Sequence, residues 1–412
     1  MEKFIPKIRF MVTSDIHYQD EHTPQRDYFE KAVGLAYNYA SSHEAYNKLD
    51  ALFVVGDFSN TGTQIQMQAF KDSIDKTVKP ETEVVVSVAR HEFLNDGEEV
   101  AYKRFKRIFD MDHDVHKVIN DFHFISVSTT NGDRFDGEKW EFASLALEAA
   151  FKDDPKKPIF FFQHPHIRDT VYGSLAWSND DLMTLLMNYP QVIDFSGHSH
   201  APINDPRSIH QKHFTAVGTG TMFYFELDEY DKIYGAIPPN KDRNKSHQVD
   251  AAQILIVEVD ESGCVRILPY DVVTEQFFPL EWEIKKPWDP STFLYTDERY
   301  NNPKKPYFKE SAKINITDLT EESVEFIFDQ ATIDEEYVNG YDITIKRKKD
   351  DVILQKISIF SEYYYLEMPE KLSQKFDLLE KATEYILSIT ANSFWKTSSD
   401  EALEINFITL ER

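Results

Sequence analysis

Aspartate and histidine residues end four separate apolar runs in the first half of the chain. They are Asp15 and His17 after IRFMVTS, Asp57 after ALFVVG, His164 after PIFFFQ, and His198 and His200 after VIDFSG. Side chains two residues apart leave an extended chain on the same face, so a carboxylate and an imidazole at that spacing can bind one ion. Oxygen and imidazole ligands without thiolate suit Mn, Fe, Zn or Ni. The four run ends together predict a site for divalent metal ions.

Each of these motifs alone has a simpler structural explanation. A single Asp-x-His is also typical of a surface turn, and a lone histidine at a strand end is often a hydrogen-bonded packing residue. Four independent run ends that carry the same residue types favour the metal site.

The elements that position these residues alternate between short apolar runs and longer amphipathic segments up to about residue 275. This alternation is typical of layered α/β proteins. Strands are predicted over 8–15, 51–57, 83–90, 122–129, 158–164, 192–198, 213–220, 253–260 and 265–273, and helices over 26–43 and 138–153. The segment 225–250, rich in polar residues, is predicted to be a long loop.

A second domain is predicted after a linker at 285–308, where four prolines and mixed charges occur. About seven short strands with turn signals follow and favour a β-sandwich. Among them is YYYLEMP at 363–369. The end of the chain is similar to a fibronectin type III module, with Leu379 and Tyr385 placed like its tyrosine corner. The predicted domains are 1–295 and 296–412.

Composition limits the partners of the protein. The chain has 71 acidic and 45 basic residues, a formal charge of −26, which disfavours duplex nucleic acid and anionic membranes. The single cysteine, Cys264, cannot form an internal disulfide, and no apolar run approaches the roughly 20 residues of a membrane span. We expect a cytoplasmic protein, and any nucleic-acid-like substrate should be small. The sequence does not predict an oligomeric state.

Five motifs, DIH, GDFSN, RHE, QH and GHSH, follow one another at predicted strand ends. In this order they resemble the calcineurin-like metallophosphoesterases over roughly residues 8 to 220. The resemblance implies a four-layer α/β sandwich, in which two mixed sheets are flanked by helices, and one or two divalent ions. It implies Asp15, His17 and His200 at the first ion, a bridging Asp57, and His164 and His198 at the second. His91 would contact the phosphate and act as the acid for the leaving group.

Position 90 departs from that family, whose third motif reads Gly-Asn-His and uses the asparagine oxygen as a metal ligand. Arg90 has no acceptor and repels a divalent ion. Three interpretations remain open. Arg90 binds the substrate phosphate; or it pairs with an acid such as Glu92 or Asp96 while another group, for instance Asn60 or Asn95, completes the metal shell; or the site is impaired.

Further residues are candidates for the lining of the substrate cleft. They are His166, Arg168, Tyr172 and Trp177 after the His164 strand, Asn60, and the aromatic residues Phe223, Tyr224 and Tyr234 beside the 225–250 loop. An ordinary amphipathic loop or a solvated insertion is the alternative for each segment.

The predicted function is metal-dependent hydrolysis of phosphoric esters, with a small phosphodiester as substrate. It would use a metal-activated water, with His91 as acid and Arg90 in place of the usual asparagine. The alternative is an altered member of the family that binds a ligand, serves as a scaffold, or acts on a non-phosphate substrate.

Overall fold

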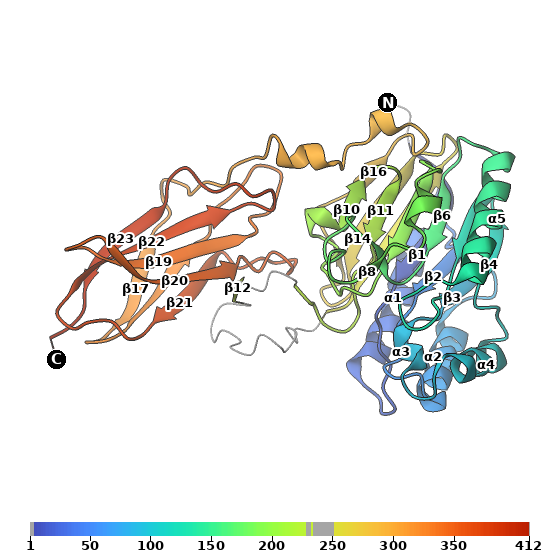
Figure 1. Cartoon of the computed structure of the whole chain (residues 1–412), viewed down its shortest axis with the longest axis horizontal. Coiled ribbons are helices and arrows are strands. Elements are labelled where there is room, and N and C mark those ends of the chain that lie inside the picture. Colours follow the sequence, from blue (N-terminus) through green and yellow to red (C-terminus); the bar gives the residue numbers. More distant parts are fainter. Residues whose placement is uncertain (1–3, 228–231, 234–250, 412) are drawn as a thin grey trace. The chain divides into compact units, whose positions relative to one another are not determined.

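The computed structural model describes residues 4–227, 232–233 and 251–411 (Figure 1). The described residues form two units. The first contains 4–227 and 251–297, and the second contains 232–233 and 298–411.

One mixed sheet of the first unit has seven strands in the order β15-β14-β13-β1-β2-β3, with β16 also paired to β14. Their bounds are β1 Pro6–Thr13, β2 Ala51–Val55, β3 Glu83–Ser87, β13 Gln253–Asp260, β14 Val265–Asp271, β15 Gln276–Phe277 and β16 Trp282–Ile284. β1, β2 and β3 are parallel, with Met11 beside Leu52 and Val54 beside Val86, and β13 is antiparallel to β1.

The other mixed sheet of this unit has six strands in the order β10-β11-β9-β6-β5-β4. Their bounds are β4 Val115–Ile119, β5 Phe122–Ser126, β6 Ile159–Phe162, β9 Val192–Ser196, β10 Ile209–Gln211 and β11 Thr215–Gly218. The four inner strands are parallel, and β4 and β10 are antiparallel edges.

Phenylalanine side chains fill the space between the two sheets. Phe53 of the first sheet stacks on Phe162 of the second with ring centroids 4.2 Å apart, and Phe10 meets Phe160 at 4.9 Å. Aromatic rings bury large areas and pack edge to face or offset, so they hold the sheets at a fixed spacing.

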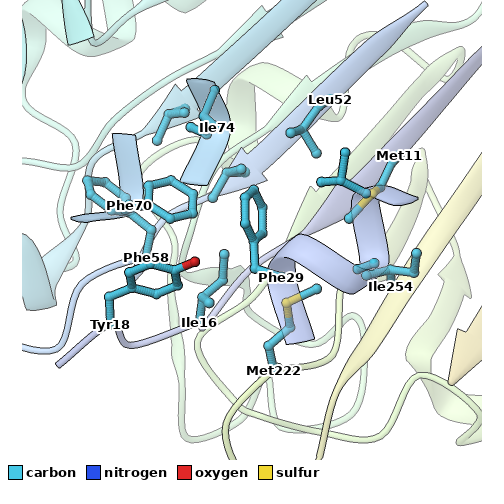
Figure 2. Close-up of a cluster of buried hydrophobic side chains, with 14 of the residues drawn as sticks. Met11, Ile16, Tyr18, Phe29, Leu52, Phe58, Phe70, Ile74, Met222 and Ile254 are labelled. Atoms are coloured by element: carbon cyan, nitrogen blue, oxygen red, sulfur yellow. The ribbon is translucent and has the colours of Figure 1, made fainter. Parts of the chain in front are cut away.

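Helices cover the outer faces of both sheets. On the first sheet, α1 (Pro24–Ser41), α2 (Gln64–Thr77) and α4 (Glu98–Phe109) enclose a buried cluster that includes Met11, Phe29 and Phe70 (Figure 2). On the second sheet, α5 (Gly137–Asp153) packs Leu147 against Phe161. The predicted α/β sandwich with mixed sheets is therefore confirmed. Short elements complete the unit: α3 Arg90–Phe93, β7 His166–Ile167, β8 Ser178–Asn179, α6 Met183–Leu186, and 3-10 turns at Pro206–Ser208 and Pro290–Thr292.

Hydrogen bonds join the two sheets at the carboxyl ends of their parallel strands. The hydroxyls of Ser87 and Ser126 lie 2.9 Å apart, and the Val88 N–H donates to Ser128 Oγ at 2.9 Å. The loops that follow β3 and β5 are thereby fixed beside each other.

The second unit is an all-β structure of a five-stranded sheet, β12-β20-β19-β22-β23, and a three-stranded sheet, β17-β18-β21. The bounds are β12 Lys232–Ile233, β17 Ile314–Leu319, β18 Val324–Asp329, β19 Gly340–Arg347, β20 Val352–Phe360, β21 Lys371–Phe376, β22 Glu384–Asn392 and β23 Leu403–Ile408, after a 3-10 turn at Asp297–Tyr300. The prediction of a strand at 363–369 is wrong. Those residues form turns in which Tyr363 and Tyr364 are buried, and the alternating segment after them forms β21 instead. None of the described helices has the length and apolar character needed to span a membrane.

Candidate metal centre

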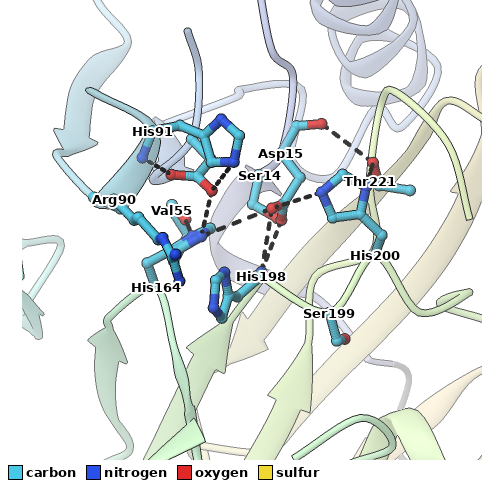
Figure 3. Close-up of polar contacts among 12 residues, drawn as sticks. Ser14, Asp15, Val55, Arg90, His91, His164, His198, Ser199, His200 and Thr221 are labelled. Carbon is cyan, nitrogen blue, oxygen red and sulfur yellow. Dashed lines mark hydrogen bonds and ion pairs between the residues drawn. The ribbon is translucent and has the colours of Figure 1, made fainter. Parts of the chain in front are cut away.

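The six predicted ligand residues lie together at the carboxyl edge of the parallel strands. Figure 3 labels Asp15, His164, His198 and His200 among them. Asp15 and His17 follow β1, Asp57 follows β2, His164 follows β6, and His198 and His200 follow β9. His91, in the short helix α3 after β3, joins them. Parallel strands end at one edge of their sheet, which explains how residues so distant in the sequence meet.

Five of these residues have left-handed backbone conformations. They are Asp15 (φ 51°), His17 (φ 53°), Asp57 (φ 49°), His198 (φ 72°) and His200 (φ 51°). Such conformations cost about 1–3 kcal/mol each and persist where surrounding structure enforces them, which is common at functional sites. The strained turns bend each loop back so that its side chains face the cluster.

Gly56 makes the turn before Asp57 possible. Its φ is +80°, and an added Cβ would lie 2.7 Å from Ala89 Cβ and 2.8 Å from His164 Cγ. Only glycine lets the β2 turn lie this close to His164.

Asp15, His17 and His200 form the first group of potential ligands. The Nε2 atoms of His17 and His200 are 3.1 Å apart, and Asp15 Oδ1 is 3.3 Å from His200 Nε2. The other Asp15 oxygen, Oδ2, accepts hydrogen bonds from the His198 N–H at 3.0 Å and from the Ser14 hydroxyl.

Asp57, His164 and His198 form the second group. Asp57 Oδ2 lies 2.9 Å from His164 Nε2, and Asp57 Oδ1 accepts the His91 N–H at 3.0 Å. Asp57 also forms a third group with His17 and His91, so it lies between the two sets. A carboxylate in this position has oxygens for two ions.

Main-chain carbonyls fix the orientation of three histidine rings. The Nδ1–H groups of His164, His200 and His91 donate to the carbonyls of Val55 (2.7 Å), Tyr224 (2.9 Å) and Asn60 (2.7 Å), respectively. With Nδ1 engaged in this way, Nε2 of each ring faces the cluster, where it can bind an ion when the ring is neutral, as in metal-binding histidines. His164 Nε2 is buried and lies 2.9 Å from Asp57 Oδ2. These buried carboxylates and oriented imidazoles fit divalent metal ions.

The charges of the cluster shift its titration strongly. Burial alone would raise the pKa of Asp57, but His164 holds it well below its ordinary range. Burial would lower the pKa of His164, yet Asp57 and Asp15 raise it to about 10. Burial, followed by the charge of His164, lowers the pKa of His198 to about 4. The carboxylates are thus ionised and attract positive charge.

Glu92 is a buried support of the centre that the sequence suggested only as a partner for Arg90. Its Oε1 accepts the Ser59 N–H and Oγ–H, both at 2.9 Å, and its Oε2 accepts the N–H groups of Ala89 (2.9 Å) and Asp57 (3.2 Å). Burial and then the charge of Asp57 raise the pKa of Glu92 to about 8. Glu92 therefore ties the loop after β2 to the loop after β3.

Arg90 extends from α3 toward His164 and His198 (Figure 3). Its Nη1 donates to Asp133 Oδ2 at 3.1 Å, so its partner is neither Glu92 nor Asp96. Asp96 pairs with Arg104 instead. Asn95, one suggested replacement ligand, donates to Asp96 Oδ2 at 2.6 Å, and Asn60 meets His91 through its main chain.

Asp133 is a residue of the site that the sequence reasoning missed. Its other oxygen, Oδ1, lies 3.7 Å from His198 Nε2. The available signal was the end of the predicted 122–129 strand, because the loop after it reaches the same sheet edge.

The candidate lining residues lie in different places. Trp177 borders the pocket, and its ring meets that of His198 edge-on with centroids 5.2 Å apart. His166 is buried behind it, with its two ring nitrogens each 2.8 Å from a serine hydroxyl. Tyr172 is buried under the guanidinium of Arg207, and Arg168 is exposed and donates to Asp180 at 3.1 Å.

A pocket of about 270 Å³ opens over the cluster. It is lined by Asp57, Arg90, His91, Leu94, Trp177, His198, His200, Tyr224 and Glu226. Tyr224 is thus at the pocket, whereas Tyr234 lies outside the described residues. Potential metal ligands, the guanidinium of Arg90 and the aromatic rings of Trp177 and Tyr224 therefore border the same pocket.

Comparison with known proteins shows what the first unit resembles. Residues 8–202, a little under half of the chain, match the family model of the calcineurin-like phosphoesterases. Together with the Asp and His groups, this match indicates a domain similar to metal-dependent phosphoesterases.

Individual solved structures share little sequence identity with this chain. The purple acid phosphatase PPD1 from yellow lupin (Lupinus luteus) seeds shares 13% identity over 68% of this chain and 53% of its own, with a TM-score of 0.45. The fn3 domain of human collagen alpha-1(XX) chain shares 11% identity over 26% of this chain and 84% of its own, with a TM-score of 0.20. No curated protein matches the sequence.

Proposed function

We propose that the first unit hydrolyses small phosphodiesters with the help of divalent metal ions. The observation that carries this proposal is the clustering of two Asp and four His ligand groups beneath a pocket that His91 and Arg90 also line. The match to calcineurin-like phosphoesterases supports the reaction class.

Each of the two ions would be bound by a different set of residues. Asp15, His17 and His200 would hold one ion, His164 and His198 the other, with Asp57 between the two. When bound, a pair of ions such as Mn, Fe, Zn or Ni supplies an activated water and stabilises the charge of a displacement at phosphorus.

His91 is the acid that protonates the leaving group. Its Nδ1–H is used by the Asn60 carbonyl, so Nε2 is the atom available at the pocket, 4.0 Å from Asp57 Oδ2. Its side chain is 31% exposed, which permits contact with a substrate. An imidazole N–H at this position can donate its proton to the departing alkoxide.

Arg90 binds the phosphate. One Nη is engaged by Asp133, and the guanidinium has further N–H groups on the side of the pocket. A guanidinium can donate two parallel hydrogen bonds to two oxygens of one phosphate.

The walls of the pocket favour a diester over a monoester. Glu226 places a carboxylate at the wall, which repels the second negative charge of a monoester more than it repels a singly charged diester. Trp177 and Tyr224 offer aromatic surface to the group attached to phosphorus.

Turnover of two chromogenic esters tests the proposal. With Mn added, bis-p-nitrophenyl phosphate should be hydrolysed with higher kcat/KM than p-nitrophenyl phosphate. Asp57→Asn and His91→Ala should each reduce kcat by at least about 100-fold, because a ligand or a proton donor is lost.

The matched control is His22→Ala, which removes an exposed histidine paired with Asp27 and should leave turnover unchanged. Absence of metal-dependent turnover of both esters would refute the proposal and favour a ligand-binding or scaffold protein. Faster turnover of the monoester would refute the diester preference alone.

A further inference from the structure

We propose that Asp133 supplies the oxygen ligand that Arg90 cannot provide, so that the second ion is held by Asp57, His164, His198 and Asp133. The inference rests on the metal-dependent function proposed above and assigns a ligand from outside the five sequence motifs.

The need for such a ligand arises at position 90. An arginine there has donors only, so it cannot take the place of an amide oxygen at a metal. Its guanidinium instead reaches Asp133, at 3.1 Å, and the arginine side chain is 51% exposed.

The two carboxylate oxygens of Asp133 have different surroundings. Oδ2 accepts the hydrogen bond from Arg90. Oδ1 is buried, has no hydrogen-bond partner in the described part of the chain, and is 3.7 Å from His198 Nε2. A buried carboxylate oxygen without a donor is costly, and a cation beside His198 would remove that cost.

The distance to His198 suits a shared ion, and Asp133, which lies outside the 4.8 Å group of Asp57, His164 and His198, would move toward the other two ligands on binding. Oxygen and nitrogen ligands lie about 2.0–2.2 Å from a metal such as zinc, so two ligands of one ion are about 3.0–3.5 Å apart. The observed 3.7 Å between Asp133 Oδ1 and His198 Nε2 is close to that range.

The main chain holds Asp133 at the centre. The loop after β5 is closed by two hydrogen bonds between Thr130 and Arg134, at 2.7 and 3.0 Å. The Thr129 N–H donates to the Val88 carbonyl at 3.2 Å, two residues before Arg90. A main-chain hydrogen bond therefore joins the loop that carries Asp133 to the loop that carries Arg90.

The charge balance explains why the arginine is tolerated. Arg90 alone would add one positive charge beside a divalent ion. The ion pair of Arg90 with Asp133 is neutral overall, as an asparagine side chain is. The pair thus replaces the amide without changing the net charge of the ligand set.

Counting bound ions tests this assignment independently of catalysis. Each protein is equilibrated with Mn, freed of unbound ion and analysed for metal per chain, and Mn binding to the metal-free protein is titrated by calorimetry. The unmodified protein should bind two ions and Asp133→Ala one. The double variant Asp133→Ala with Arg90→Asn should bind two again, because the amide oxygen returns.

The control is Arg134→Asn, which removes another arginine of the same loop that pairs with Asp181 and should leave two ions bound. Thermal unfolding of the metal-free proteins checks that they fold. If Asp133→Ala does not fold, Asp133→Asn takes its place and should bind the second ion at least tenfold more weakly.

Three results would overturn the assignment: one ion in the unmodified protein, two ions with unchanged affinity in the Asp133 variant, or no recovery in the double variant. The last would leave Asp133 as the ion-pair partner of Arg90 alone. If the ion counts are as expected but neither ester is hydrolysed, the proposed function fails and the ligand assignment stands.

Discussion

At the scale of single residues, the centre depends on groups that fix the ligands as much as on the ligands. Three histidines are oriented by main-chain carbonyls, and Glu92 accepts four hydrogen bonds from the loops that carry Asp57 and His91. Such supporting contacts commonly set metal affinity.

Replacement of Glu92 by alanine should destabilise the metal-free protein by at least about 3 kcal/mol. The N–H groups of Asp57, Ser59 and Ala89 would lose their acceptor inside the protein, at about 1–3 kcal/mol each. Urea unfolding measures the change. Glu98→Ala, which removes the acceptor of the exposed Asn131 N–H, is the control and should cost less than about 1 kcal/mol. An equal loss of unfolding free energy in the Glu92 and Glu98 variants would contradict the role of Glu92.

The ligands could be predicted from the sequence, but the partner of Arg90 could not. Asp15, Asp57 and the histidines each follow an apolar run directly, so residue type and strand end coincide. Asp133 lies 43 residues from Arg90 and several residues beyond the end of β5. The sequence therefore favours its neighbours Glu92 and Asp96 as partners, although both have other partners in the structure.

At the scale of elements, the parallel strands of both sheets were predictable because they are continuous apolar runs bounded by turns. The segment 363–369 was not, because three consecutive tyrosines are as suitable for a packed turn as for a strand. The true strand, β21, has only Leu372, Gln374 and Phe376 on its buried face, a weak apolar pattern.

A buried carboxyl group on β9 should make stability depend on pH. Asp194 is fully buried, its neighbour is the Gln163 side-chain amide, and burial raises its pKa from 3.8 to about 8. The folded protein thus retains a proton that the unfolded chain loses above about pH 4. The contribution of this group to stability is complete below that pH and is lost as the pH rises through about 8, at about 1.4 kcal/mol per pH unit.

Asp194→Asn should remove this dependence, because an amide resembles the neutral acid and does not titrate. The unfolding free energy of the variant should fall less steeply between pH 5 and pH 8 and exceed that of the unmodified protein at pH 9. Urea unfolding at several pH values is the measurement. Parallel pH profiles of the two proteins would show that Asp194 is ionised in the fold.

At the scale of the whole molecule, the formal charge of −26 opposes the approach of an anionic substrate. Salt shortens the range of this repulsion, from about 30 Å at 0.01 M to about 8 Å at 0.15 M. The kcat/KM for bis-p-nitrophenyl phosphate should therefore rise several-fold over that range, with little change in kcat. A fall in kcat/KM would show that the local charge of Arg90 and the ions dominates the approach.

The left-handed backbone of the ligand residues has a consequence for redesign of the centre. Aspartate, asparagine and histidine are the non-glycine residues most often found at positive φ. A cysteine at His200 would offer a donor atom but does not belong to the residue types that favour this backbone conformation. The turns themselves thus select oxygen and imidazole ligands and make conversion to a thiolate site for softer metals costly before any ion binds.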